Sequence, residues 1–157
     1  MAYILHGYVL IFVIAMNHID VALETGAIAQ QGQDMARVLI VDDDPLVLET
    51  LVHMMESAGY SVLTASDGKQ ALRTCMENQP DLVIVDMIMP EMEGLETIKQ
   101  LKHCHADLKI IAISGGGSLR PKDYLDLAKK LGAHAAVTKP CTRDELVNTA
   151  KKLLLEQ

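Results

Sequence analysis

The sequence contains no tryptophan and a single phenylalanine, so its hydrophobic residues, which are half of the total, must build an aliphatic core. A chain of 157 residues is long enough for one domain with a core of its own. Cysteines are few and widely spaced, at Cys75, Cys104 and Cys141, which argues against a disulfide framework and against a zinc-ligand pattern. We expect three free thiols in a reducing, cytoplasmic compartment.

Clustered positive charge is lacking as well. The formal net charge is −7, and the first 35 residues contain three of the 21 acidic residues but no Lys or Arg. The remaining residues therefore carry 18 acidic side chains against 14 basic ones, a net charge of −4. Binding to a nucleic-acid backbone needs clustered Lys and Arg, so we expect no nucleic-acid partner.

No apolar run reaches the length of a clear membrane span. Residues 1–16 are almost entirely apolar, but a spanning helix needs about 20 such residues, and Asn17, His18 and Asp20 follow. The basic residues that open a secretory signal peptide are also missing. We interpret residues 1–35 as a hydrophobic N-terminal extension, either a non-native or a dispensable start. A membrane-associated helix within residues 1–20 and a helix that packs on a partner are the alternatives.

From Ala36 onward, short apolar runs alternate with segments of helical spacing. A continuous apolar run is typical of a parallel strand that is buried on both faces. The runs predict strands at residues 37–42, 61–65, 81–86, 109–113 and 134–138. The segments between them predict helices at residues 45–58, 67–78, 93–104, 120–131 and 142–155. These strand–helix units predict a doubly wound α/β domain with a five-stranded parallel sheet over residues 36–157.

Local signals at the helix ends support these boundaries. Pro45 suits the first turn of a helix, and Gly59 suits the position just after a helix end. Asp67 can cap the second helix with Gln70 in the reciprocal position, and Thr142 opens a similar capping box for the last helix.

Polar side chains stand at the carboxyl ends of four predicted strands. They are Asp42 and Asp43 after the first strand, Asp86 at the third, Ser114 at the fourth and Lys139 at the fifth. In a parallel sheet the chemistry collects beyond the carboxyl ends of the strands, so we expect these side chains to converge on one crevice.

The same side chains suit phosphoryl chemistry. Gathered carboxylates repel one another and favour a hard divalent cation such as Mg²⁺, which takes oxygen ligands. The ammonium group of Lys139 and the hydroxyl group of Ser114 would complete a clamp for a phosphoryl group. A carboxylate inside such a clamp can itself be the nucleophile that forms an acyl phosphate.

Four motifs occur in order at these strand ends. They are Val41-Asp42-Asp43-Asp44-Pro45, Asp86-Met87-Ile88-Met89-Pro90 with Gly94-Leu95-Glu96, Ser114-Gly115, and Lys139-Pro140. From about Ala36 to Leu155 the chain resembles the response-regulator receiver domain of two-component signalling. The resemblance implies a flavodoxin-like (βα)₅ fold with strand order 2-1-3-4-5, and a cis peptide bond before Pro140.

The resemblance also implies a metal site. Asp43 and Asp86 would bind Mg²⁺ directly, and the backbone carbonyl of Ile88 would be a third ligand. Asp42 would act on the metal ion through a water molecule.

A phosphoryl acceptor and its contacts are implied as well. Asp86 would accept the phosphoryl group from a phosphohistidine on a sensor histidine kinase or a histidine phosphotransfer protein. Lys139 would contact the phosphate, and Ser114 would move inward to hydrogen-bond it, which would reshape the nearby surface. Gly115 has no side chain and would leave the pocket open.

Two positions depart from the family pattern. The residue three places before Lys139 is often an aromatic switch residue, and here it is Ala136, so an aromatic rotamer cannot carry the signal. The glycine-rich segment 115–118 and the helix predicted after it lie on the usual output face, which predicts a distinctive choice of partner.

We therefore expect a stand-alone response regulator that catalyses only its own phosphorylation and dephosphorylation. No effector segment follows the last predicted helix, so the signal would pass to a downstream target protein, directly or in a phosphorelay. One alternative is a Mg²⁺-dependent phosphohydrolase with an aspartate nucleophile, which needs a second acid two residues later. The residue two positions after Asp86 is Ile88, which is not an acid, although Asp42 and Asp44 are two acids with this separation. The other alternative is a binding module that is never phosphorylated.

Overall fold

The computed structural model describes residues 35–89, 94–115 and 121–155. The chain divides into two units, Met1–Met35 and Ala36–Gln157, and all of the described strands and helices belong to the second. The interpretation of residues 1–34 falls outside the described residues and stays a prediction. Among the helices that the structure describes, none combines the length and the apolar character needed to cross a membrane.

Strands and helices alternate along the described part of the chain. The strands are β1 (Arg37–Val41), β2 (Ser61–Ala65), β3 (Leu82–Asp86), β4 (Lys109–Ser114) and β5 (Ala135–Thr138). The helices are α2 (Pro45–Glu56), α3 (Gly68–Asn78), α4 (Gly94–Cys104), α5 (Pro121–Lys130) and α6 (Arg143–Leu155). The predicted bounds agree with these to within two residues, except that positions 93 and 120 lie outside the described residues.

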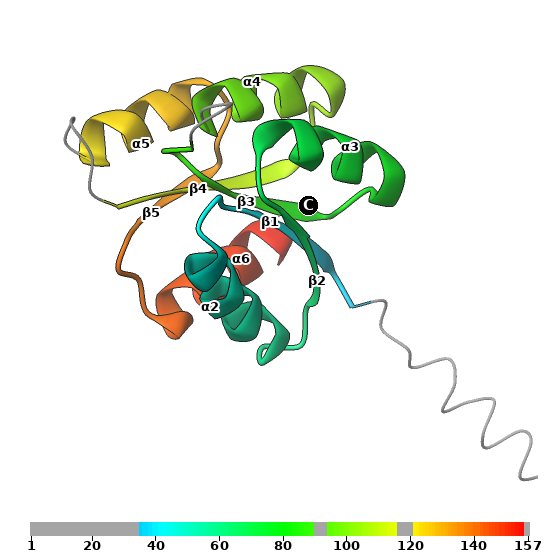
Figure 1. Cartoon of the computed structure of the whole chain (residues 1–157), viewed down its shortest axis with the longest axis vertical. Coiled ribbons are helices and arrows are strands. Elements are labelled where there is room, and N and C mark those ends of the chain that lie inside the picture. The colour runs from blue at the N-terminus through cyan, green and yellow to red at the C-terminus, as the bar shows by residue number, and fades with distance from the viewer. Residues whose placement is uncertain (1–34, 90–93, 116–120, 156–157) are drawn as a thin grey trace, which may run out of the picture. The chain divides into compact units, whose positions relative to one another are not determined.

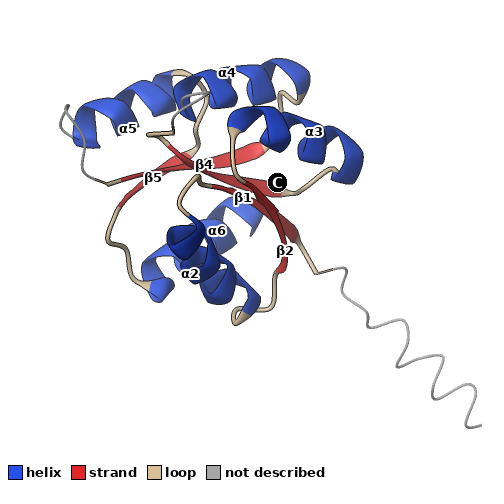
Figure 2. Cartoon of the chain, viewed as in Figure 1, coloured by secondary structure: helices blue, strands red, loops and turns tan. Residues whose placement is uncertain are grey.

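The five strands form one parallel sheet in the order β2-β1-β3-β4-β5. Helices α2 and α6 cover one face of this sheet, and α3, α4 and α5 cover the other (Figures 1 and 2). The predicted doubly wound α/β fold, with its strand order, is confirmed.

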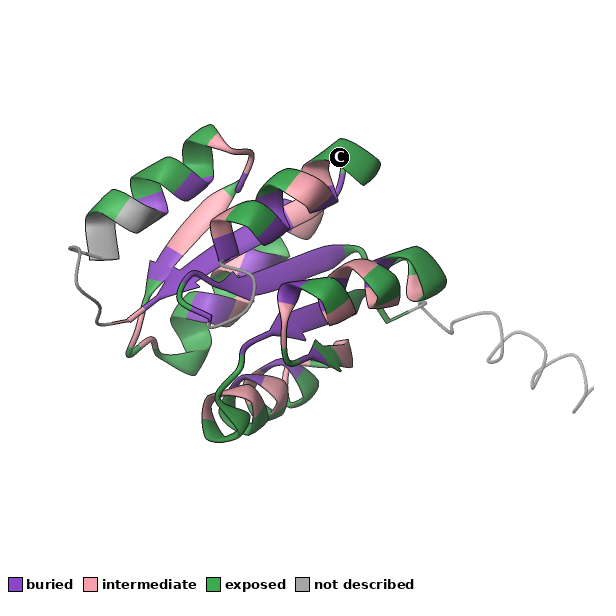
Figure 3. Ribbon diagram, turned by 45° about the horizontal axis from the view of Figure 1, so that its top comes forward, coloured by how far each residue is buried: buried purple, intermediate pink, exposed green. Residues whose placement is uncertain are grey.

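The core consists of two apolar layers, one on each face of the sheet. Figure 3 shows that the buried residues are concentrated in the strands. Successive strand residues point to opposite faces, so in β1 Val38 and Ile40 join one layer while Leu39 and Val41 join the other. All four of these side chains are fully buried. The continuous apolar runs in the sequence therefore reflect strands that helices cover on both sides.

The helix ends follow the predicted signals. The side chain of Asp44 accepts hydrogen bonds from the backbone of α2, and that of Asp67 accepts one from Gln70 at the start of α3. Gln70 reaches back to the N–H of Ser66, one residue earlier than a reciprocal capping box requires. Gly59 takes a φ of 88° just after α2, a left-handed conformation that glycine adopts without strain.

Candidate functional site

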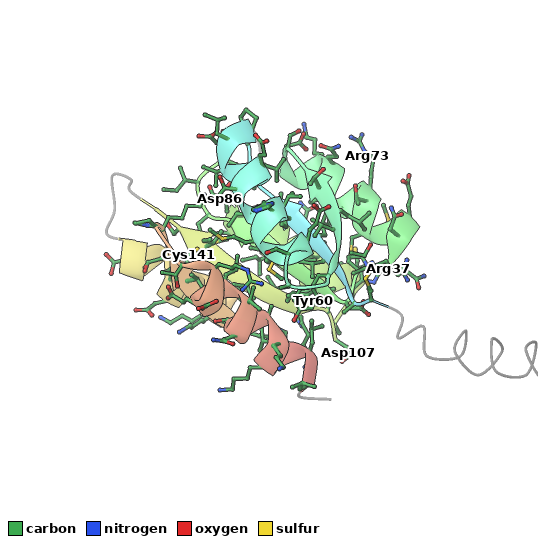
Figure 4. All side chains as sticks on the ribbon, turned by 90° about the horizontal axis from the view of Figure 1, so that it is seen from below. Arg37, Tyr60, Arg73, Asp86, Asp107 and Cys141 are labelled. Carbon is green, nitrogen blue, oxygen red and sulfur yellow. The ribbon has the colours of Figure 1, made fainter. Side chains whose placement is uncertain are left out.

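The carboxyl ends of the strands bring three charged side chains together. Asp42 directly follows β1, Asp86 is the last residue of β3, and Lys139 directly follows β5. Figure 4 shows Asp86 toward one edge of the domain, and Arg37 and Asp107 toward the opposite one. The site therefore lies at the edge of the sheet where parallel strands end, as the sequence predicts.

Lys139 is shared by two buried carboxylates. Its Nζ lies 2.6 Å from Oδ2 of Asp42 and 2.7 Å from Oδ1 of Asp86. The second oxygen of each carboxylate accepts a backbone hydrogen bond, from the N–H of Asp44 at 3.0 Å and of Ile88 at 2.8 Å. Asp42 is only 2% exposed and Asp86 only 5%, so these bonds supply the partners that buried charges require.

The surroundings of Asp86 and Lys139 pull their pKa values in opposing directions. Burial raises the pKa of Asp86 and the negative charge of Asp42 adds to this, against the lowering by Lys139 and by the N–H of Ile88. Burial alone would lower the pKa of Lys139, but its bonds to the two carboxylates bring it above its usual value. Lys139 thus stays charged, while ionisation of Asp86 remains costly.

Ser114 contributes a buried hydroxyl group at the same edge. It ends β4 and is fully buried, and its Oγ has no hydrogen-bond partner among the residues that the structure describes. Its backbone carbonyl accepts the N–H of Lys139 at 2.8 Å, and the preceding residue, Ile113, is the register partner of Asp86. A buried hydroxyl without a partner is unusual in a folded protein, and this one is available to an oxygen that enters the site.

The two remaining predicted ligands, Asp43 and Ile88, lie at the rim of the site. Asp43 is exposed next to the buried Asp42, and Ile88 is 40% exposed. Within the described residues, no three His, Cys, Asp or Glu side chains are grouped closely enough to hold a metal ion. The donor set itself suits Mg²⁺, because it consists of carboxylate and carbonyl oxygens at one sheet edge. The assignment of metal ligands stays a prediction.

Gly94 also belongs to this site, but the sequence does not show why a glycine is needed at this position. It opens α4, and a Cβ there would lie 2.1 Å from the carbonyl oxygen of Asp86 and 2.7 Å from Cα of Met87. The helix therefore starts directly against the backbone that carries Asp86. The motif that carries the family resemblance contains Gly94, but no spacing or composition signal points to this contact.

Gly94→Ala should destabilise the domain by about 2 kcal/mol, because the added methyl group overlaps backbone atoms that cannot move aside cheaply. Gly115→Ala is the matched control, because among the described residues its methyl group would meet only the Lys139 side chain, with Cβ at 3.4 Å and Cδ at 3.6 Å, which are ordinary contacts. Urea unfolding of both variants measures the two effects. Equal stability of the two variants would contradict the tight packing at Gly94.

An apolar groove borders the site. It has a volume of about 460 Å³ and runs between α2 and the segment after β5. Leu46 and Met54 line the helix side, Pro140 and Cys141 line the other side, and Lys139 stands at the site end. The peptide bond between Lys139 and Pro140 is cis, as predicted. Leu46 is 73% exposed, so the groove presents apolar surface beside the charged centre.

Comparison with known proteins gives one consistent family. The model of the response regulator receiver domain matches residues 38–151. The chain is 33% identical over 121 residues to the alkaline phosphatase synthesis transcriptional regulatory protein PhoP of Bacillus subtilis, which covers 77% of this chain and 49% of that protein. It is 34% identical over 118 residues to sporulation initiation phosphotransferase F of the same species. That alignment covers 75% of this chain and 93% of the phosphotransferase. The chain spans about half the length of the first curated relatives it matches.

Solved structures that resemble this chain belong to the same family. A response regulator receiver domain protein from Clostridium thermocellum superposes with a TM-score of 0.72 at 31% identity, covering 76% of this chain and 94% of that one. The response regulator protein TrrA from Thermotoga maritima, in complex with Mg²⁺ and a beryllium fluoride, superposes with a TM-score of 0.67 at 35% identity. That match covers 76% of this chain and 99% of TrrA.

Proposed function

Because this chain belongs to the response regulator receiver domain family, we propose that it is a switch activated by phosphorylation of Asp86. One observation carries the proposal: two buried carboxylates share the ammonium group of Lys139. Asp86 is the better acceptor of the two, because its strand pairs with β4, whose last residue, Ser114, offers a buried hydroxyl with no hydrogen-bond partner in the described part of the chain. Asp42 lies one strand further from Ser114.

In the proposed reaction, a carboxylate oxygen of Asp86 attacks the phosphorus atom of a phosphohistidine. A P–O bond forms, the P–N bond breaks, and the electron pair of that bond returns to the imidazole of the donor. The Lys139 ammonium offsets the negative charge that gathers on the phosphoryl oxygens, and the Ser114 hydroxyl donates a hydrogen bond to one of them. Mg²⁺ held by Asp43, Asp86, the carbonyl of Ile88 and, through water, Asp42 would supply further positive charge.

We propose that the phosphoryl donor and the downstream target are both proteins that bind this chain directly. The donor would be a sensor histidine kinase or a histidine phosphotransfer protein, and the apolar groove beside Lys139 suits a helix of such a donor. The receiver would pass its state to a downstream target protein. In the curated relatives named transcriptional regulators, the matched segment is only about half of the protein. The acidic balance of this domain favours protein over nucleic acid. The free cysteines are consistent with the cytoplasm.

The phosphohydrolase alternative has less support. It would use Asp42 as the nucleophile and Asp44 as the general acid. The side chain of Asp44 instead accepts hydrogen bonds from the N–H groups of Leu46 and Val47 as the cap of α2. A carboxylate engaged as a helix cap is poorly placed to carry protons for catalysis.

The full chain incubated with Mg²⁺ and acetyl phosphate tests the proposal. Intact-mass measurement should show a gain of about 80 Da, one phosphoryl group, that a chelator prevents. The same preparation should not turn over p-nitrophenyl phosphate. Steady turnover would favour the phosphohydrolase. Absence of any gain, with acetyl phosphate and with a panel of phosphorylated histidine kinases alike, would contradict the switch and favour a binding module.

A further inference from the structure

His134 and Ile110 exchange two hydrogen bonds at the amino-terminal end of the β4–β5 pairing. The backbone N–H of His134 donates to the carbonyl of Ile110 at 2.8 Å. The backbone N–H of Ile110 donates in return to the imidazole Nδ1 of His134 at 3.2 Å. The regular register of the two strands begins one residue later, with Ile111 opposite Ala135. An imidazole thus takes the place of a backbone acceptor in the sheet.

The backbone shows why a side chain is needed there. Ile110 is fully buried, so its N–H group requires an acceptor inside the protein. In a regular ladder that acceptor would be a carbonyl of the neighbouring strand. Here the chain has just left the turn at Gly132, whose φ is 113°, and the strand β5 has not yet begun. His134 is the first residue after the turn that can serve both as backbone donor and as side-chain acceptor.

We propose that His134 is an acid-sensitive latch that holds the amino-terminal end of β5 against β4 only while its imidazole is neutral. To accept the bond, Nδ1 must carry a lone pair, so the single proton of the neutral ring sits on Nε2. Protonation places a second N–H on Nδ1. Two donors then face each other, the imidazole turns away, and the N–H of Ile110 loses its acceptor.

The groups around His134 keep the latch closed at neutral pH. Although His134 is an exposed residue, partial desolvation lowers its pKa most, and the positive charges of Lys102 on α4 and Lys109 on β4 lower it further. Lys102 lies over the turn, because a side-chain carbon at Gly132 would come within 2.9 Å of its Cγ. The helix α5, which packs against β5, has Lys129 and Lys130 in its last turn. Protonation of His134 therefore requires a lower pH than protonation of an ordinary histidine does.

The latch acts on the strand that leads to the charged site. The strand β5 is short and, among the strands that the structure describes, lies at the edge of the sheet next to β4. At its far end, the N–H of Lys139 donates to the carbonyl of Ser114. His134 and Lys139 thus fasten the two ends of the same strand, and acid releases the end opposite the site.

Nitrogen NMR of the full chain tests the latch without reference to phosphorylation. At neutral pH, the ring of His134 should carry its proton on Nε2, and a proton on Nδ1 would overturn the proposal outright. Amide hydrogen exchange gives the second readout. From neutral pH to about pH 5, the protection factor of the Ile110 amide should fall about tenfold, the effect of one lost hydrogen bond.

Two variants at position 134 separate the effect of protonating the imidazole from the effect of removing the side chain. His134→Asn keeps an oxygen acceptor on the same side-chain carbon as Nδ1 but does not titrate, so the Ile110 amide should stay protected at both pH values. His134→Ala should lose the protection at both. Unchanged protection in His134→Ala at neutral pH would contradict the latch. His53→Asn, an exposed histidine on α2, is the control and should behave like the wild type. If His134→Ala does not fold, the tautomer measurement on the wild type still decides.

Discussion

Asp86→Asn is expected to abolish phosphorylation completely while the domain remains folded. The amide is a poor nucleophile, so no acyl phosphate can form at that position. The side chain keeps its shape, and its oxygen can still accept a hydrogen bond from Lys139 or from the N–H of Ile88. Intact-mass measurement after incubation with Mg²⁺ and acetyl phosphate should show the full phosphoryl gain in the wild type and none in the variant.

The same substitution should leave the free energy of unfolding within about 1 kcal/mol of the wild type, or raise it, in the absence of Mg²⁺. Burial and the charge of Asp42 raise the pKa of Asp86, so the folded state binds this proton more tightly than the unfolded state does. Stability that depends on Asp86 is therefore present at low pH and is lost as the pH rises through the raised pKa. Relative to the wild type, Asp86→Asn should gain stability over that interval.

Urea unfolding from about pH 4 to pH 7 measures this difference. Asp107→Asn is the matched control, because Asp107 is exposed and lies at the opposite edge of the domain (Figure 4). It should retain phosphorylation and the pH dependence of the wild type. A variant at Asp86 that still gains a phosphoryl group would contradict the assignment of the acceptor.

Lys139→Met is expected to give the largest loss of stability among substitutions at the site, about 3 kcal/mol at neutral pH. Methionine retains the length of the stem but leaves Asp42 and Asp86 without their shared cation. Removal of one partner from a buried ion pair usually costs about 3–5 kcal/mol, and the 21% exposure of the Lys139 side chain favours the lower end. Phosphorylation should also fall steeply, because the positive charge next to the phosphoryl group is gone.

The pH dependence identifies the cause of that loss. Without Lys139, the pKa of Asp86 should rise further, because the ammonium group no longer lowers it. The variant should then recover stability as the pH falls through this raised pKa, since protonation removes one of the two buried charges. Adding Asp42→Asn should restore part of the stability at neutral pH. Lys129→Met, at an exposed lysine, is the control, and an equal loss of stability there would contradict the explanation.

The convergence of Asp42, Asp86 and Lys139 could be predicted, because it depends only on parallel strands and on residues at their carboxyl ends. Asp44 caps α2. Spacing alone does not show which of the other two neighbouring acids is buried: Asp42 lies against Lys139, whereas Asp43 is exposed. Their sequence context is nearly identical, and only the path of the chain out of β1 separates them.

Contacts between segments that are far apart in the chain also could not be predicted from the sequence. The fit of Gly94 against the carbonyl of Asp86 depends on how α4 lies on the sheet, and no local pattern records that distance. The bond from Ile110 to the His134 ring spans 24 residues and arises because the turn at Gly132 leaves a buried N–H without a backbone acceptor. Periodicity predicts elements and faces, whereas such contacts depend on the packed arrangement.

The position of the phosphoryl group tests most directly whether Asp86 is the phosphoryl acceptor. The full chain is phosphorylated with acetyl phosphate and Mg²⁺, and borohydride then reduces the acyl phosphate, which converts the modified aspartate to homoserine. Peptide mapping by mass spectrometry locates the homoserine. Homoserine is expected at Asp86 alone, and none is expected in the Asp86→Asn variant. Homoserine at Asp42 or Asp43 instead, with Asp86 unmodified, would contradict it.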